Sequence, residues 1–263
     1  KVEISIPTYY ILPIMDGVIS IKGNFAHGWV GKTRILDSLN GLNGDAAFIS
    51  NNKNPKTYFH QKSFYVKLGK PYWKLNLFGG FNHQVFWGNE QAAYGPKFGL
   101  TGLEAFFHVI TGKTYGENGI PLSKIGNQLG SIDIAAEYKF EKVRVKVYRQ
   151  NFYDVGALSK LANVSDGLNG LSFENTEINS RDKTVRWSKI LVEFFYSKDQ
   201  AGYPWSTPTK SGDEDYYNNY YYRNGWSYKN LGLGSPLITG RKNAREGQAS
   251  NETDYFINNR VIA

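Results

Sequence analysis

The sequence predicts an all-β protein built from antiparallel hairpins, and three observations support this fold class. Apolar and polar residues alternate with period two through several segments, as they do in strands whose two faces meet different surroundings. Short turns join these segments at one end, whereas long Gly- and Asn-rich stretches join them at the other. Aromatic residues gather where the segments end. Two architectures combine these features, a soluble β-sandwich and a transmembrane β-barrel.

The clearest hairpin comprises residues 132–140 and 142–148. One face carries apolar residues, namely Ile132, Ile134, Ala136, Tyr138 and Phe140 in the first segment and Val143, Val145 and Val147 in the second. The opposite face carries Asp133, Ala135, Glu137 and Lys139, and then Lys142, Arg144, Lys146 and Tyr148. Glu141 and Lys142 lie between the two runs, which predicts a tight turn.

A second hairpin is predicted for residues 58–68 and 72–87, with its turn at Gly69, Lys70 and Pro71. Residues 188–196 alternate in the same way, and residues 17–25 do so more weakly. Residues 103–111 break this period. Their apolar side chains have helical spacing and Gly112 follows them, so we expect one short helix there.

Alternation alone does not separate a sandwich from a barrel, because both have one apolar face per strand. Three features favour the barrel. The stretches 37–57, 88–101, 112–129, 154–183 and 198–225 are long, whereas the opposite turns are short, as in outer-membrane barrels. Aromatic pairs such as Phe86–Trp87 and Phe195–Tyr196 lie at strand ends, where interfacial girdles belong. No predicted strand is apolar on both faces.

Composition and motifs give no indication of catalysis. The chain has 263 residues, a formal charge of +8 and no Cys, which excludes thiolate metal sites and a Cys nucleophile. Its Lys and Arg are scattered, so we expect no nucleic-acid partner. Two Gly-Lys-Thr stretches lack the glycine that a phosphate loop needs five residues earlier, and the four His lack metal-clamp spacing. We therefore expect no enzyme activity, no cofactor and no metal, and we interpret the acidic run 213–215 as a solvated loop.

Aromatic residues beside amides and Arg are the one positive signal for a binding site. The stretch 213–228, DEDYYNNYYYRNGWSY, concentrates them. Trp and Tyr rings stack on the C–H faces of sugars, while amide and guanidinium groups bind sugar hydroxyls. The candidate sugar-binding residues are Trp226, Tyr228, Arg223, Asn224, Tyr222 and Trp205. For each ring, girdle or loop packing is the alternative interpretation.

Several stretches together resemble a known family. They are His27-Gly28-Trp29, the His- and Gln-rich hairpin at 58–88, KVYRQNFYD at 146–154, VEFFYSKDQAG at 192–202 and DYYNNYYYRNGWSYKNLGLGSPL at 215–237. The chain resembles the capsule assembly Wzi family in the form found in Bacteroidota. The resemblance implies an integral outer-membrane β-barrel with a helix near its external mouth. It also implies lectin-like binding of capsular or surface polysaccharide without catalysis, and His83 and Gln84 of the hairpin join the candidate residues.

The overall prediction is a single domain, residues 1–263, that forms an up-and-down outer-membrane β-barrel. We expect an incomplete barrel, because barrels of the family are longer and usually end on a terminal aromatic. Its expected partners are surface polysaccharide, the lipid bilayer and other outer-membrane proteins. Lys74, Arg144, Lys146 and Lys189 are expected to make its interior basic. The alternatives are a porin-like channel, an accessory barrel subunit of a secretion or assembly complex, and a soluble glycan-active enzyme or carbohydrate-binding sandwich.

Overall fold

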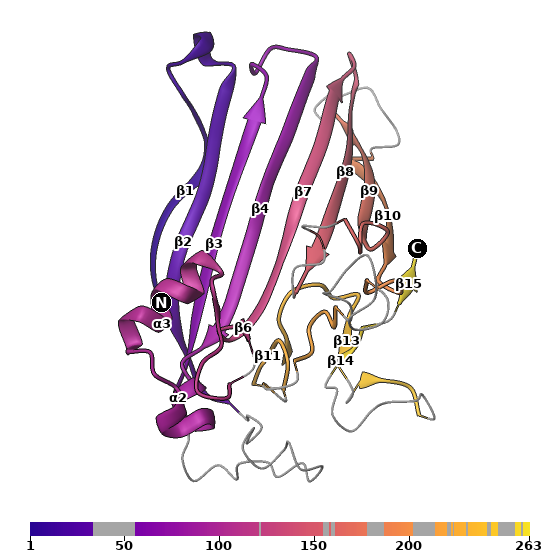
Figure 1. Cartoon of the computed structure of the whole chain (residues 1–263). Helices are drawn as coiled ribbons and strands as arrows, with labels where there is room; N and C mark the ends of the chain where they lie inside the picture. Colours follow the sequence, from indigo (N-terminus) through magenta and orange to yellow (C-terminus); the bar gives the residue numbers. More distant parts are fainter. Residues whose placement is uncertain are drawn as a thin grey trace.

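The structure, a computed structural model, is one large antiparallel sheet with a C-terminal region packed against one of its faces (Figure 1). It describes residues 1–33, 56–120, 122–154, 158, 161–177, 187–201, 214–219, 222, 224–229, 231–240, 243–246, 256–258 and 260–263. Arg223 and Trp205, two of the candidate sugar-binding residues, lie outside these residues.

Nine strands form the sheet, in the order β1-β2-β3-β4-β7-β8-β9-β10-β15. Their bounds are β1 Val2–Ile11, β2 Ile19–Lys32, β3 Lys56–Leu68, β4 Leu75–Trp87, β7 Asn127–Lys139, β8 Val143–Tyr153, β9 Gly167–Asn175, β10 Lys189–Tyr196 and β15 Val261–Ile262. Consecutive long strands are neighbours and antiparallel, so the sheet is an up-and-down meander.

Short elements follow the long strands at the loop end of the sheet, the lower end in Figure 1. The helices there are α2 Glu90–Tyr94 and α3 Gly102–Thr111, with the 3-10 turn η3 Gly95–Lys97, whereas the 3-10 turn η1 Met15–Gly17 joins β1 to β2 at the opposite end of the sheet. The remaining strands are β5 Thr114–Tyr115, β6 Ser123–Lys124, β11 Ser227–Tyr228, β12 Leu231–Gly232, β13 Thr239–Gly240 and β14 Phe256–Ile257. Neither described helix has the length and apolarity that a membrane-crossing helix needs.

The all-β prediction is confirmed, as are both hairpins, the strand at 188–196 and the short helix. The predicted closure is not seen among the described residues, because β1 pairs only with β2 and β15 pairs only with β10. The predicted long loop 154–183 was wrong in part, since β9 occupies Gly167–Asn175. β9 was missed because Gly167, Asn169 and Gly170 dilute its apolar alternation.

The register separates the sheet into an apolar face and a polar face. Directly opposed residues share a face, so the pairs Phe64–Phe81 and Ala136–Val147 belong to the apolar face. The pairs Ser63–Asn82 and Glu137–Lys146 belong to the polar face. The apolar face is exposed over much of its area: Ile4 is 78% exposed and Val192 is 59% exposed.

The sheet curves toward its polar face. The ring centroids of Tyr9 on β1 and Phe78 on β4 lie 5.8 Å apart, although strands β2 and β3 lie between β1 and β4 in the sheet. Adjacent strands are about 4.8 Å apart, so a flat sheet would separate these strands by about 14 Å. The polar face is therefore concave, and polar side chains from distant strands converge on it.

A loop-end core fills the concave side where the long loops begin. Phe86, Leu129, Phe152 and Phe195 contribute strand side chains to it. The C-terminal region contributes Tyr216, Tyr217, Tyr222, Trp226, Ile238 and Phe256. The indole of Trp226 stacks on Phe86 with ring centroids 4.3 Å apart. This packing buries Tyr216, Tyr217, Tyr222 and Trp226 of the stretch 213–228.

Helix α3 packs on the opposite, apolar face near the same end. Thr101 and Glu104 form a capping box at its start, and Gly112 ends it in the left-handed conformation. Its Phe106 ring lies edge-on to the rings of His27 and His60. Lys62 of β3 donates a hydrogen bond to the carbonyl of Ile110. The helix thus covers the row of His and Trp side chains where the apolar face meets the loop end.

Candidate functional site: a lysine and tyrosine cavity on the concave face

Two rows of cross-strand neighbours on the polar face have the same composition. In the first row, Tyr65, Gly80 and Asp133 lie opposite one another on β3, β4 and β7. The Tyr65 hydroxyl donates to Asp133 Oδ2 at 2.9 Å. The second row repeats this on β8, β9 and β10 with Tyr148, Gly170 and Glu193, where the tyrosine hydroxyl donates to the Glu193 carboxylate.

A glycine in the middle of each row lets the tyrosine ring lie flat across the neighbouring strand. A Cβ added to Gly80 would lie 2.3 Å from the Tyr65 ring, and one added to Gly170 would lie 2.0 Å from the Tyr148 ring. Glycine inside a strand often marks such a close approach. Each ring is therefore supported from below by backbone and held in place by its carboxylate.

Lysine ammonium groups lie over these rings. Lys22 Nζ is 5.0 Å from the Tyr9 ring centroid and 4.9 Å from that of Tyr65. Lys146 Nζ is 5.1 Å from the Phe78 ring and 6.0 Å from the Tyr148 ring. Ammonium groups at these distances are attracted by the negative faces of the rings. Neither lysine forms an ion pair with a carboxylate in the part of the chain that the structure describes.

These side chains line one cavity of about 380 Å³, here called the lysine–tyrosine cavity. Its polar lining includes Lys22, Tyr65, Asp133, Lys146, Tyr148 and Glu193. The Oδ1 atom of Asp133 is buried and has no hydrogen-bond partner among the described residues. The cavity therefore combines flat rings, free ammonium donors and a carboxylate acceptor, the groups that bind hydroxylated rings. No group of three metal-ligating side chains occurs among the described residues.

A second cavity of about 340 Å³ lies between the polar face and the loop-end core. Strand residues Asn82, Gln84 and Gln150 line one side of it, and Tyr217 and Pro236 of the C-terminal region line another. Gln150 and Glu193 line both this cavity and the lysine–tyrosine cavity. The two hollows are therefore neighbours along the same concave face.

The structure does not bring the predicted candidate residues into one site. Trp226 is 1% exposed and Tyr222 is 2% exposed, because both belong to the loop-end core. The Tyr222 hydroxyl instead faces Glu90 Oε1 of α2 at 3.4 Å. These two rings therefore pack in the protein core, as the alternative interpretation predicts, and are not exposed for stacking on a sugar.

The other candidates are dispersed. Tyr228 is 42% exposed in β11, and the carbonyl of Asn224 accepts a hydrogen bond from Ser227 in the turn before that strand. His83 and Gln84 are consecutive on β4, so they face opposite sides of the sheet. His83 Nε2 is bonded to Gln128 on the apolar face, whereas Gln84 lines the second concave cavity. Gln84 is thus the candidate closest to the site described here.

The prediction that the acidic run is a solvated loop was wrong for Glu214, which is fully buried. Its carboxylate accepts a hydrogen bond from the backbone of Asp154. Burial, and then the nearby charges of Glu214 and Asp215, raise the pKa of Asp154 well above its ordinary value. Burial likewise raises the pKa of Asp166, which accepts a 2.7 Å hydrogen bond from the hydroxyl of Tyr216. These carboxyl groups tie the C-terminal region to the strand ends.

The expected basic interior is corrected in its details. Arg144 lies 3.9 Å from Glu137 and 3.4 Å from Glu174, so acidic neighbours balance it. Lys189 lies opposite Glu174, and Lys74 precedes the first residue of β4. Lys146 alone of the four predicted residues lines the lysine–tyrosine cavity. Positive charge on the concave face is concentrated locally, and Lys22 was not predicted to take part.

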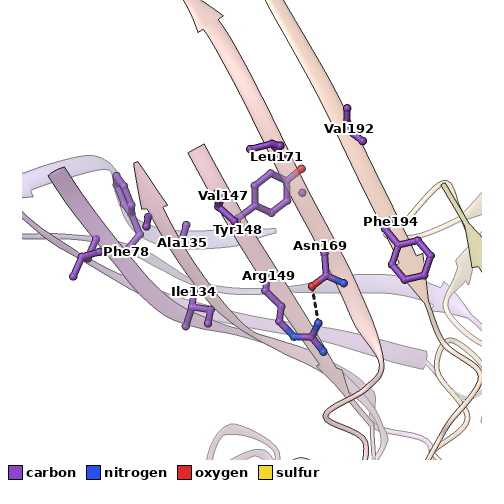
Figure 2. A pocket seen from close by; sticks show the side chains of 13 residues that line it. Phe78, Ile134, Ala135, Val147, Tyr148, Arg149, Asn169, Leu171, Val192 and Phe194 are labelled. Carbon is purple, nitrogen blue, oxygen red and sulfur yellow. Dashed lines mark hydrogen bonds between the residues drawn. The ribbon is translucent and has the colours of Figure 1, made fainter. Parts of the chain in front are cut away.

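The apolar face carries a wide, shallow groove of about 790 Å³ (Figure 2). Ile134, Val147, Leu171, Val192 and Phe194 line it from four successive strands. Arg149 donates a 2.6 Å hydrogen bond to Asn169 at its edge, the dashed line in Figure 2. Its lining is almost wholly hydrocarbon, which suits acyl chains or other apolar surfaces and does not suit hydroxylated ligands.

Comparison with protein-family models, with curated proteins and with solved structures gives no match. The resemblance to the capsule assembly family therefore stays a prediction. The cavity was missed at the sequence level because its residues come from eight strands, and the sequence alone does not show how those strands pair. One signal was present: Tyr65 and Tyr148 occupy polar-face positions of the alternating pattern, and glycines interrupt β4 and β9.

Proposed function

We propose that the chain is a non-enzymatic outer-membrane β-barrel wall that binds a surface or capsular polysaccharide on its concave face and assists capsule assembly or attachment. The observation that carries this proposal is the contrast between the two faces of the sheet. One face exposes a largely hydrocarbon surface, interrupted by the hydrogen-bonded pair Arg149 and Asn169, and the other holds a cavity of tyrosine, lysine and carboxylate side chains.

The dimensions of the apolar face suit a bilayer. On β4 its apolar stretch runs from Leu75 to Phe81, beyond which Lys62 and His83 face the same side. The six steps between these seven residues, at about 3.3 Å each, give about 20 Å, close to the apolar band of about 25 Å on outer-membrane barrels. Exposed aromatic side chains lie beyond its two ends, such as Trp73 at the turn end and Trp29 at the loop end. Interfacial girdles are placed in this way.

The membrane part is tested by a matched pair of substitutions on β10. Val192 and Leu191 are adjacent, aliphatic and similarly exposed, but they face opposite sides of the sheet. A Lys in the lipid costs about 2–4 kcal/mol near the bilayer midplane, whereas one in an aqueous interior costs little. We expect Val192→Lys to reduce insertion into liposomes, measured as heat-modifiable gel migration, and Leu191→Lys to retain it. Full solubility of the unmodified protein without detergent contradicts a membrane location.

The glycan part is tested at the two tyrosine rows. Tyr65→Leu and Tyr148→Leu remove the stacking ring and the hydroxyl donor while keeping an apolar side chain, so each is expected to lower binding on a glycan array about tenfold. Tyr10→Leu, an exposed tyrosine on β1 outside the cavity, is the control and should bind normally. If the unmodified protein binds no glycan but conducts ions in planar bilayers, the porin-like alternative holds instead.

One observation favours the accessory-subunit alternative. Among the described strands, β1 has a partner on one side only, and β10 is paired with β15 over just Phe195 and Tyr196. Backbone N–H and C=O groups must be hydrogen-bonded inside a bilayer, so both edges require further strands there. If a different outer-membrane protein supplies them, the purified chain should be monomeric alone. Under an added thiol oxidant, single Cys residues placed on β1 should form disulfides with single Cys residues placed on the edge strand of that protein. The chain has no native Cys that would compete.

A further inference from the structure

We infer that the ligand of the lysine–tyrosine cavity is an acidic glycan, whose sugar carboxylate is bound by Lys22 and Lys146. This inference rests on the proposed glycan-binding function and adds the chemical class of the sugar. It depends on the two lysines that line the cavity, which form no ion pair with a carboxylate among the described residues.

Each carboxylate of the cavity accepts one tyrosine hydroxyl, although Oδ1 of Asp133 has no partner among the described residues. Asp133 accepts the hydroxyl of Tyr65, and Glu193 accepts that of Tyr148. Glu137, opposite Lys146 on β7, lies 3.9 Å from Arg144. The two lysines, by contrast, lie over aromatic rings and form no ion pair among the described residues. An ammonium group has three donors, and a ring face satisfies none of them as a hydrogen-bond acceptor does. An acceptor for these ammonium groups is therefore the group that a ligand carboxylate would supply.

The aromatic rings place both ammonium groups on the same cluster. Tyr9 and Phe78 are in contact, and Lys22 lies over Tyr9 while Lys146 lies over Phe78. A third ammonium group, that of Lys67, lies 5.9 Å from the Phe78 ring. Three strands therefore direct cations to one aromatic floor, and the concave wall reduces their contact with bulk water. A sugar carboxylate can pair with such ammonium groups while its ring lies on the aromatic floor.

Neutral sugars satisfy this arrangement less well. Their hydroxyls can accept hydrogen bonds from the lysines, but they carry no charge that attracts the two ammonium groups. A sugar carboxylate adds a Coulombic attraction to each ammonium group that a neutral hydroxyl does not supply. The cavity should therefore discriminate between a uronic acid and the same sugar with its carboxylate esterified. Affinity for the acid should also fall as the salt concentration rises.

The test is a glycan array that carries uronate-containing oligosaccharides beside their methyl esters, probed with the full chain in detergent. We expect the acidic member of each bound pair to be preferred. Lys22→Gln and Lys146→Gln should each weaken binding of the acid about tenfold and binding of the ester little. Lys22→Arg keeps the charge and should keep most of the preference. Lys113→Gln removes an exposed lysine outside the cavity and should change nothing.

Each outcome decides a different claim. Equal binding of acid and ester, unchanged in both Gln variants, overturns the acidic-glycan inference and leaves the proposed function standing. Preference for the acid that survives both substitutions also overturns it, because other residues then bind the carboxylate. No binding to any glycan on the array overturns the proposed function as well. Tyr65→Leu, measured beside them, shows whether any loss is specific to charge.

Discussion

Tyrosine occurs in two regions of one concave face, and the regions differ in what covers the rings. In the loop-end core, Tyr216 and Tyr222 are buried among other aromatic side chains from the strands and the C-terminal region. In the lysine–tyrosine cavity, Tyr65 and Tyr148 are half-buried, with backbone on one side of each ring and a cavity on the other. Both regions also contain a tyrosine hydroxyl that donates to a carboxylate.

The comparison shows that tyrosine density is a poor guide to a binding site. The segment 213–228 has the highest density, yet its described rings mostly serve to pack the core. The cavity draws single tyrosines from separate strands, and its ring faces stay open because glycine lies beneath them. A binding ring needs support on one face only, whereas a core ring is covered on both.

The largest expected effect is the loss of the core aromatic ring. Trp226→Ala removes the indole that stacks on Phe86, and such buried Trp or Phe deletions cost about 3–5 kcal/mol. We expect a lower midpoint of thermal unfolding and faster proteolysis of the C-terminal region. Trp29→Ala is the control, because Trp29 is 64% exposed, and it should lower the midpoint far less. Similar destabilisation by both substitutions would contradict the distinction between core and open rings.

A smaller effect is expected where a glycine supports an open ring. A Cβ on Gly80 would lie 2.3 Å from the Tyr65 ring and 2.6 Å from the carbonyl oxygen of Phe64. Gly80→Ala should therefore displace the Tyr65 ring, lower the free energy of unfolding by about 1–3 kcal/mol and weaken glycan binding. Gly79 is the adjacent control on the other face, where the nearest atom to an added Cβ is 4.0 Å away. If Gly79→Ala weakens glycan binding as much as Gly80→Ala does, the close approach of Gly80 to the Tyr65 ring is not the cause of the loss.

Most of the fold follows from period-two alternation. The sequence predicts both hairpins and assigns Tyr65, Asp133 and Glu193 to the polar side of their strands, as the structure places them. Alternation is local, so it does not predict whether a sheet closes, nor which side chains meet across it. Tyr9 and Phe78, for example, approach because of curvature summed over several strands.

The site was less predictable than the fold, for a physical reason. His83 and Gln84 are adjacent in sequence, and adjacency in a strand separates side chains to opposite faces. Trp226 and Tyr222 are amphipathic, so composition alone does not decide between burial and ligand contact. Their burial depends on Phe86 and Glu90, which are more than 100 positions away in the sequence. Partners that are distant in the sequence thus decide whether an aromatic ring is buried in the core or free to contact a ligand.

The smallest expected effect is a change of stability with pH, which comes from carboxyl groups buried near the loop-end core. The raised pKa of Asp154 means that the folded protein binds its proton more tightly than the unfolded chain does. Its stability contribution is thus fully present below an unfolded pKa of about 4 and is lost as the pH rises toward the folded pKa. The same sign holds for Asp166 and for Glu90, whose pKa burial also raises. We expect the core to weaken with rising pH.

Asp154→Asn should relieve this loss, because it keeps the shape of the side chain and removes a charge that Glu214 and Asp215 repel. The variant should be more stable than the unmodified protein at pH 7.5, by about 0.5–2 kcal/mol as for other stabilising single substitutions, and should gain much less at pH 4. Asp16→Asn is the control of opposite sign, since Lys70 lowers the pKa of Asp16 and its ion pair strengthens as the carboxyl ionises. Thermal unfolding of all three proteins from pH 4 to 8 separates the cases. A gain for Asp154→Asn that is equal at both ends of this range would mean that packing, and not ionisation, limits the core.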